Sequence, residues 1–221
     1  MLNIIQGPKI IEVLITIIFG SVGYLIGSVS FAIIVSNFRG ILDPRDYGSK
    51  NPGATNVFRS GDRLAGVLTF LGDFAKGYLS VVLASAASQI LLNNQSSITG
   101  ITVLVSIAVV LGHIFPVFYG FKGGKGVATT FGVLLATSFP IGGLASLVWV
   151  ITFVVTKVSG FAAISAALSL PVISFFVIKM EYHQEFWLAY GMICILSTLL
   201  LFRHSTNILA LTRGLKKKNE N

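Results

Sequence analysis

Long uncharged, apolar runs alternate with short polar loops along the chain. The runs cover residues 13–38, 77–112, 127–156, 158–178 and 186–202. Since a helix needs about 20 apolar residues to cross the hydrocarbon core of a membrane, most of these runs can span it. The first run exceeds the roughly 7 to 15 apolar residues of a signal-peptide core, and no small-residue cleavage site follows it. We interpret it as the uncleaved first helix of an all-α, polytopic membrane protein.

The run at 127–156 is interrupted by Pro140, Gly142 and Gly143, which together are a turn signal. We expect two short helices here, which brings the predicted number of transmembrane helices to seven. The first of them, at 127–139, falls short of the ~20 residues of a full crossing. It either thins the bilayer or forms a re-entrant hairpin with the next helix, and the pattern leaves both open.

The positive charges gather at one end of the predicted spans. Relative to the apolar runs, most Lys and Arg residues fall on one face, and only Lys9 and Lys179 fall on the other. The positive-inside rule makes the first face cytoplasmic. We therefore expect the N-terminus outside and the C-terminus, with a basic tail at 203–221, in the cytoplasm.

Composition supports this assignment. The chain has 221 residues, of which 54% are hydrophobic and 11% charged, and its mean hydropathy is +0.85. Because a soluble domain has roughly 25% charged residues, we expect a single integral-membrane domain over residues 1–221. The net charge of +8 belongs to one membrane surface, so we expect anionic lipid headgroups and anionic substrates as partners, and no nucleic acid. The lone Cys194 excludes an intramolecular disulfide.

A glycine-rich loop at 120–126 has the composition of a phosphate site. It contains four glycines and two lysines and opens directly onto an apolar run. Glycines let successive backbone N–H groups converge on an anion, and a helix N-terminus adds a positive dipole end. The alternative is an ordinary cationic loop between two helices. It is not the P-loop of nucleotide hydrolases, because Lys125 is followed by Gly126 and no glycine lies five residues before Gly124. The candidates are Lys122, Gly123, Gly124, Lys125 and Gly126.

An earlier loop, at 48–59, is also rich in polar side chains. Its candidates are Ser49, Asn51, Thr55, Asn56 and Arg59. An arginine can fork onto two phosphate oxygens, and a serine can donate or accept a hydrogen bond. The alternative is a hydrophilic connector in which Ser49 and Asn56 cap helices. Four neighbouring residues are predicted to form structural ion pairs: Asp43, Arg45, Asp46 and Asp62.

Three further ionisable sets accompany the loops. Asp73 and Lys76 lie three residues apart on one face of a predicted span and can neutralise each other, as a functional site or as a structural pair. His113 precedes Pro116 and is predicted to pack or cap the end of the third span. Beyond the last span, His204 and Asn207 share a helix face next to Arg203, which favours a site.

No Cys, His and carboxylate cluster has metal-ligand spacing, and no Gly-x-Ser-x-Gly elbow is present. We therefore expect neither a metal nor another cofactor, and no serine triad.

At these residues the chain resembles the bacterial acyl-phosphate:glycerol-3-phosphate acyltransferases of the PlsY family, which are small seven-span membrane enzymes. Three motifs carry the resemblance: Asp43-Pro-Arg45 through Arg59, Gly112-His113-Ile-Phe-Pro116 through Lys125-Gly126-Val-Ala-Thr129, and Arg203-His204-Ser-Thr-Asn207. Two departures are visible. Lys50, followed by Asn51 and Pro52, replaces a glycine of the first motif, and the usual Gly-x-Glu at the end of the third motif reads Gly214-Leu215-Lys216.

The resemblance implies transfer of a fatty acyl group from acyl phosphate to the 1-hydroxyl of glycerol 3-phosphate, which gives lysophosphatidic acid and phosphate. The implied catalytic residues are Ser49, Arg59, Lys125, His204 and Asn207. The implied substrate-binding residues are Asn51, Thr55, Asn56, Lys122, Gly123, Gly124, Gly126 and Arg203. Either His204 or a substrate phosphate takes the hydroxyl proton. We expect a monomer in the bacterial cytoplasmic membrane, with the active site on the cytoplasmic side.

Two alternatives to this reaction fit the sequence less well. Acyl-CoA-dependent acyltransferases commonly carry an Asp five residues after a His, and this chain has Phe118, Leu188 and Leu209 at those positions. A transporter for phosphate or an organic phosphate would need a substrate path at mid-membrane, often at paired broken helices. Only Asp73 and Lys76 are predicted to lie within a span, so the transporter is the less favoured function.

Overall fold

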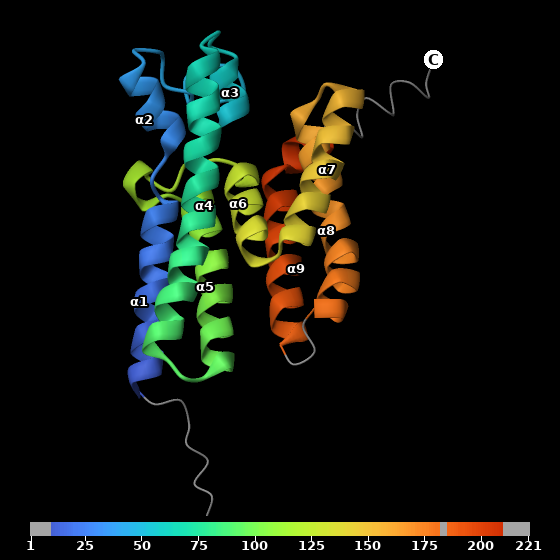
Figure 1. Ribbon diagram of the computed structural model, residues 1–221. Coiled ribbons are helices and arrows are strands. Elements are labelled where there is room, and N and C mark those ends of the chain that lie inside the picture. The colour runs from blue at the N-terminus through green and yellow to red at the C-terminus, as the bar shows by residue number, and fades with distance from the viewer. Residues whose placement is uncertain (1–9, 182–184, 210–221) are drawn as a thin grey trace, which may run out of the picture.

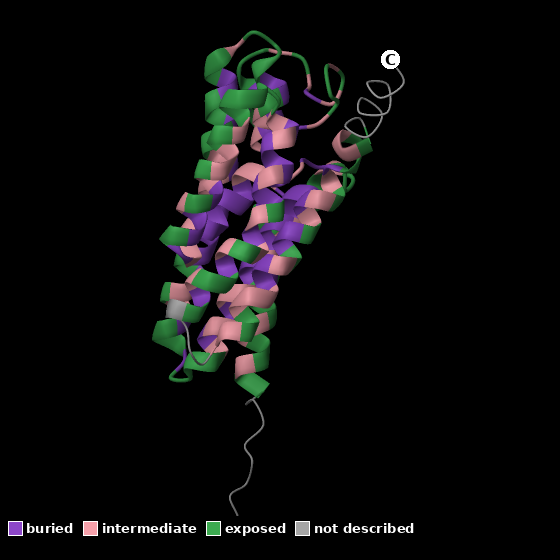
Figure 2. Ribbon diagram, turned by 90° about the vertical axis from the view of Figure 1, so that its right-hand side faces the viewer, coloured by how far each residue is buried: buried purple, intermediate pink, exposed green. Residues whose placement is uncertain are grey.

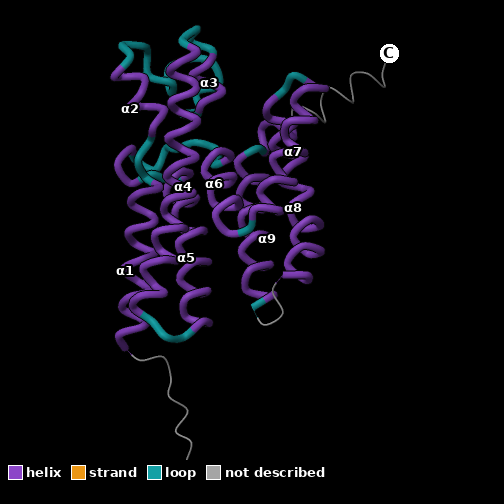
Figure 3. Tube along the Cα trace, viewed as in Figure 1, coloured by secondary structure: helices purple, strands orange, loops and turns teal. Residues whose placement is uncertain are grey.

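Helices form the framework of the protein. The computed structural model describes residues 10–181 and 185–209, with the side chains of 180 and 181 left out. Its helical segments are α1 (Ile10–Gly27), α2 (Phe31–Phe38), α3 (Ala54–Phe58), α4 (Arg63–Leu91), α5 (Gln95–Ile114), η1 (Val117–Tyr119), α6 (Val127–Thr137), α7 (Phe139–Thr156), α8 (Ser159–Glu181) and α9 (Phe186–Arg203). The part of the chain described has no strand, so the all-α prediction is confirmed (Figure 3).

Six helical segments in the described residues are long and apolar enough to cross a membrane. They are Ile10–Phe38, Arg63–Leu91, Gln95–Tyr119, Phe139–Thr156, Ser159–Lys179 and Phe186–Arg203. The remaining predicted span is α6, whose 11 residues rise only about 16 Å. This is roughly half of the hydrocarbon core. Within the described residues there are therefore six helical segments of spanning length and one short apolar helix, which is the one that the sequence predicts to be too short for a full crossing.

The first apolar run is broken into two helices. Residues 28–30 separate α1 from α2 (Figure 1). At the break, Ser28 Oγ donates to the carbonyl of Tyr24 at 2.9 Å and accepts the N–H of Val117 at 3.3 Å. The carbonyls of Gly27 and Val29, which the break leaves without a helical partner, accept from Lys76 Nζ of α4, so the break is a built feature.

The turn between α6 and α7 falls at Ser138, two residues before Pro140. Proline is tolerated in the first turn of a helix, where its missing N–H has no intrahelical partner to lose. The predicted division of this run into two helices is therefore correct, but the proline begins the second helix instead of lying in the turn. Figure 1 shows the hairpin tip within the height of the bundle rather than at its end.

Two groups of helices flank α6. In Figure 1, α1, α4 and α5 lie on one side, and α7, α8 and α9 lie on the other. Close approach brings α6 against α4, because a Cβ at Gly77 would overlap the carbonyl oxygen of Thr129, and one at Gly132 would overlap that of Phe74. Such small-residue contacts let helix backbones approach within a membrane. They fix the start of α6 relative to α4.

Burial is arranged as in a membrane protein. Buried residues run along the interior of the bundle (Figure 2), while large apolar side chains such as Leu83 and Phe176 are exposed on its outer surface. Inside α8, Pro171 cannot donate to the carbonyl of Ala167. Ser197 Oγ of α9 donates to that carbonyl at 2.6 Å instead, which holds α8 and α9 together.

Candidate active site

A cavity of about 670 Å³ lies between the polar loops and the helices α4, α6 and α7. Loops and helix ends supply its polar lining: Ser49, Asn51, Thr55, Asn56, Arg59, Lys125, Lys157, Ser159, His204 and Asn207. Helices supply its apolar lining: Phe70, Phe131, Trp149, Val150 and Phe153. The cavity therefore suits a molecule with an anionic head and an apolar tail.

The structure brings most of the sequence-predicted residues to this cavity. Nine line it: Ser49, Asn51, Thr55, Asn56, Arg59, Lys125, Gly126, His204 and Asn207. Four predicted binding residues are not among its lining: Lys122, Gly123, Gly124 and Arg203. Lys122 is exposed to solvent, and the two glycines are buried behind the loop.

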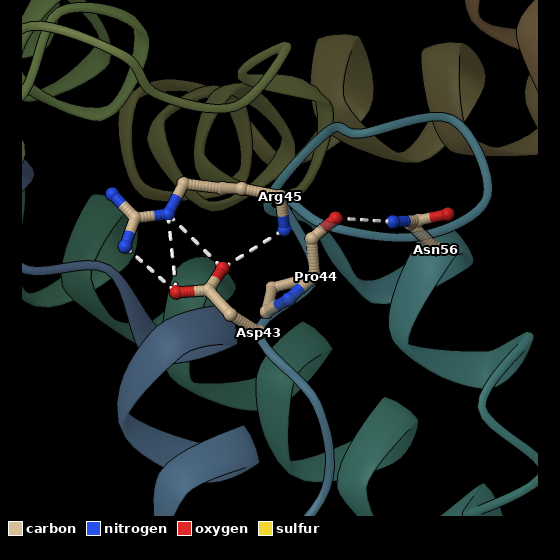
Figure 4. A network of polar contacts seen from close by, with 4 residues as sticks. All are labelled: Asp43, Pro44, Arg45 and Asn56. Carbon is tan, nitrogen blue, oxygen red and sulfur yellow. Dashed lines mark hydrogen bonds and ion pairs between the residues drawn. The ribbon is translucent and has the colours of Figure 1, made fainter.

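Asn56 organises the first loop. Its Oδ1 accepts the backbone N–H of Ser49 at 2.9 Å. Its Nδ2 donates to the carbonyl of Pro44 at 2.7 Å (Figure 4) and to that of Tyr47 at 3.1 Å. The side chain is buried and is engaged by the loop itself. It therefore positions Ser49 and is not a helix cap, since the N-cap of α3 is Gly53.

Two ion pairs flank the first loop, and Asp43 and Asp62 take part in them, as predicted. Arg45 Nη2 donates to Asp43 at 2.7 Å (Figure 4), and this bond lowers the pKa of the Asp43 carboxyl. Arg39 Nε donates to Asp62 at 2.8 Å, and Asp62 also caps α4 by accepting the N–H of Ala65 at 2.9 Å. These carboxylates are structural.

A side chain at the end of α9 hydrogen-bonds the backbone of the glycine loop. Arg203 donates through Nε to the carbonyl of Gly124 at 3.2 Å and through Nη2 to that of Gly123 at 2.9 Å. The guanidinium therefore holds the loop and does not face the cavity. Beyond the loop, Gly126, Val127 and Ala128 line the cavity. The first N–H groups of α6 lie at this edge, where an anion is favoured.

Lys125 and Asn207 meet at the centre of the cationic end. The Lys125 ammonium donates a short hydrogen bond to Asn207 Oδ1. Burial and the nearby charges of Arg203 and Arg59 lower the pKa of Lys125. Excess positive charge of this kind is relieved by an anion, so the site is poised to bind one.

His204 is held in one tautomer. Its Nδ1 lies 2.8 Å from the carbonyl of Leu200, to which it can only donate, so the neutral ring presents Nε2 as an acceptor. Burial, with the charges of Lys125 and Arg203 adding to it, lowers the pKa of His204 to about 4. The ring is therefore neutral at pH 7 and can accept a hydroxyl proton or hydrogen bond.

Several lining residues were not singled out from the sequence as site residues. Lys157 and Ser159 come from the turn between α7 and α8. Their signal was a cation followed by serine and glycine at the start of an apolar run, the same composition as the two loops. Asp73 and His113 also line the cavity; the sequence left Asp73 open between a functional site and a structural pair, and it predicted packing or capping for His113.

An aromatic group forms part of the apolar wall. Trp149 of α7 stacks on Phe153 with ring centroids 5.1 Å apart, and it meets the edge of Phe131 from α6 at 6.5 Å.

Among the described residues, no group of three or more His, Cys, Asp or Glu could hold a metal ion.

Comparison of the sequence with known families gives one match over most of the chain. Residues 17–214 match the family model described as glycerol-3-phosphate acyltransferase. The glycerol-3-phosphate acyltransferase of Neisseria meningitidis serogroup C is 45% identical over 198 residues, which is 90% of this chain and 94% of that protein. The enzyme of the same description from Ralstonia pickettii is 46% identical over 202 residues, covering 91% and 93%.

Solved structures agree with the sequence match. The crystal structure of PlsY, an integral membrane glycerol 3-phosphate acyltransferase, in its glycerol 3-phosphate form superimposes with a TM-score of 0.77 at 33% identity, covering 90% of this chain and 92% of that chain. The lysophosphatidic acid form superimposes with a TM-score of 0.75 at the same identity and coverage.

Proposed function

Because this chain belongs to the glycerol-3-phosphate acyltransferase family, we propose that it transfers a fatty acyl group from acyl phosphate to the 1-hydroxyl of glycerol 3-phosphate. The products are lysophosphatidic acid and inorganic phosphate. One observation carries the proposal: a cavity joins a cationic end, with Lys125, Arg59 and the start of α6, to an apolar wall on α4, α6 and α7. An acyl phosphate has both of these characters, and so does the product.

In this reaction Lys125 binds the acyl-phosphate group, together with the first N–H groups of α6. The hydroxyl oxygen of glycerol 3-phosphate attacks the acyl carbonyl, a C–O ester bond forms, and the C–O bond to phosphate breaks. The ammonium of Lys125 stabilises the charge that develops on the departing phosphate. Arg59 contributes a second cation at the same end of the cavity.

His204 and Asn207 orient glycerol 3-phosphate. With Oδ1 engaged by Lys125, Asn207 has its Nδ2 left to donate to a substrate oxygen. Nε2 of His204 accepts the attacking hydroxyl, and the proton passes either to this ring or to a phosphate oxygen of the substrate. Ser49, Asn51 and Thr55 line the same cavity and bind substrate oxygens. Asn56, Arg203, Gly123 and Gly124 support them by holding the two loops.

The cationic end faces the cytoplasm of a bacterial cell, and the polypeptide passes the inner membrane seven times, with α6 as a short pass. The positive-inside rule supports this orientation. α1 begins at the opposite end of the bundle from the last residues of α9 (Figure 1), as an odd number of passes requires. We propose that the protein acts as a monomer, since a single chain supplies both the cationic end and the apolar wall of the cavity. Of the basic tail at 203–221, the part from 210 onward lies outside the described residues.

Transport of a phosphate compound has less support. Transporters use unwound backbone carbonyls at broken helices to hold a cation at mid-membrane. At the break between α1 and α2, the ammonium of Lys76 already occupies the carbonyls of Gly27 at 3.0 Å and Val29 at 2.7 Å. The carbonyls that would bind a transported cation at this break are therefore bonded by a side chain of the protein itself.

The test is to purify the protein in detergent and supply glycerol 3-phosphate with palmitoyl phosphate or with palmitoyl-CoA. We expect lysophosphatidic acid, followed by mass spectrometry, from palmitoyl phosphate alone. Product from neither donor would overturn the proposal, and product from palmitoyl-CoA alone would overturn the acyl-phosphate donor.

Two lysines of the glycine loop make a matched pair for the assigned roles. Lys125→Ala should lower turnover at least about 100-fold, a loss typical of a group that stabilises developing charge. Lys122→Ala, which removes the same charge outside the cavity lining, should cost less than about tenfold. Equal losses would mean that loop charge, and not the position of Lys125, drives the reaction.

A further inference from the structure

Three buried ionisable residues lie together on α4 and α5, and two of them, Asp73 and His113, line the cavity. We propose that Asp73, Lys76 and His113 form a positioning network. It links the break between α1 and α2 to the glycine loop and fixes the position of Lys125. The inference rests on the role proposed above for Lys125. It gives these residues a function in turnover, beyond packing or neutralising one another.

The network begins at the helix break. Lys76 Nζ lies 2.9 Å from Asp73 Oδ1 and donates to the carbonyls of Gly27 and Val29. An ammonium has three N–H donors, and two of them bond these carbonyls. Both side chains are nearly inaccessible to solvent, 2% exposed for Lys76 and 3% for Asp73. Because the ammonium is anchored by two carbonyls of the helix break, its attraction for the buried carboxylate holds Asp73 next to that break.

Asp73 faces His113 on its other side. His113 Nδ1 lies 3.5 Å from Asp73 Oδ1, and neither atom has a hydrogen-bond partner among the described residues. An unpaired buried N–H costs free energy, so the carboxylate favours the ring orientation that points Nδ1 toward it. The same orientation directs Nε2 toward Gly124, because a Cβ built on Gly124 would overlap this atom.

The glycine loop rests on His113. The N–H of Gly124 donates to the carbonyl of His113 at 3.1 Å, and a Cβ on Gly123 would overlap that carbonyl oxygen. These two glycines are therefore required by close approach to His113, although neither lines the cavity. Arg203 holds the opposite side of the loop through its carbonyls. Between these two supports, the next residue, Lys125, has little freedom to move.

Loss of the link to Asp73 should therefore displace Lys125. A misplacement of about 1 Å at a catalytic group can cost about 100-fold in rate. Since Lys125 acts on the departing phosphate, the loss should appear in kcat, while the KM for glycerol 3-phosphate changes little. A purely structural role would lower the thermal stability and the active fraction without this separation of kcat from KM.

Three substitutions at one position separate the possible roles. His113→Asn keeps a donor near the place of Nδ1, His113→Gln keeps one near the place of Nε2, and His113→Phe keeps the ring volume with neither donor. We expect kcat within about threefold of the parent for His113→Asn and at least about tenfold lower for His113→Gln and His113→Phe, with the KM for glycerol 3-phosphate within about threefold throughout. Full turnover in His113→Phe overturns the network, and rescue by Gln instead of Asn overturns it in favour of a direct contact of Nε2 with substrate.

A second measurement keeps the inference testable if a His113 variant does not fold. Asp73→Asn retains the volume of the carboxylate, and we expect the same loss in kcat. Hydrogen–deuterium exchange of the segment 120–127 should be faster in Asp73→Asn than in the parent. Unchanged exchange together with unchanged kcat overturns the inference. Lys125→Ala is assayed separately: if it keeps full turnover, the proposed role of Lys125 fails, whereas the exchange experiment still reports on the network.

Discussion

Lys50 shows, at the residue scale, how the first loop tolerates an unusual side chain. Its φ is +55°, in the left-handed region that favours glycine, and the family pattern described above usually reads Gly here. A residue with a Cβ loses about 1 to 2 kcal/mol in this conformation. The loop keeps it because Asn56 fixes the backbone just before Lys50, at Tyr47 and Ser49.

We expect Lys50→Gly to raise the free energy of unfolding by up to about 1 kcal/mol, since glycine's greater freedom in the unfolded chain offsets part of the gain. Thermal unfolding in detergent measures the change. Lys50→Ala is the control, because it removes the charge and keeps the Cβ. An equal gain from alanine would attribute the effect to charge repulsion at the cationic end.

His204 makes stability depend on pH. Its pKa is lowered from 6.5 to about 4 in the folded protein, so the unfolded chain binds more protons between these values. The contribution to stability is therefore complete above about pH 6.5, and it is lost as the pH falls toward 4, by up to about 3 kcal/mol. Melting temperatures of the parent and of His204→Gln at pH 7, 6 and 5 check this. A parent that loses no more stability than the variant would contradict the lowered pKa.

At the scale of elements, the helices carry defects that other elements repair. The break between α1 and α2 is filled by Lys76 of α4, and the carbonyl freed by Pro171 in α8 is bonded by Ser197 of α9. Within a membrane no water is available to hydrogen-bond a carbonyl that lacks a helical partner. A side chain from a neighbouring helix supplies the hydrogen bond instead, and this bond joins the two elements. The repairs fix the helices on which the loops of the cavity stand.

Ser197→Ala should lower the stability by about 1 to 2 kcal/mol, because it leaves the carbonyl of Ala167 without a donor. Pro171→Ala returns a backbone N–H to that carbonyl, so the double variant should recover most of the loss. Thermal unfolding of the two single variants and the double variant forms the cycle. Thr198→Ala, whose hydroxyl bonds within its own helix at Cys194, is the matched control. Additive losses would exclude the proposed repair.

At the scale of the whole molecule, the proposed orientation can be tested from outside the cell. Asn93 lies in the exposed connection between α4 and α5, at the opposite end from the glycine loop. In a Cys194→Ser background, Asn93→Cys should react with a membrane-impermeant maleimide added to spheroplasts, and Lys122→Cys should react only after lysis. Labelling of Lys122→Cys in spheroplasts, with Asn93→Cys labelled only after lysis, would show the opposite orientation, in which the cavity faces the outside.

Much of the molecule could be predicted from local properties of the chain. The spacing of apolar runs predicts the helices because about 20 residues must be buried in hydrocarbon, and the Gly, Lys and Arg content of the loops predicts an anion site. Most of the predicted polar residues line one cavity. The motifs also identify the family, which the comparisons confirm.

Other features depend on contacts between residues distant in the chain. The break at 28–30 is stabilised by Lys76, and the side chains of Arg203 and Asn56 bond backbone groups of the two loops. His113 reaches Asp73 and Gly124 only when α4, α5 and the loop come together. The sequence alone determined which residue types lie at the cationic membrane surface, since hydropathy and charge act locally. Only the tertiary structure decided which of them face the cavity and which hold it, because hydrogen bonds choose partners by distance and direction.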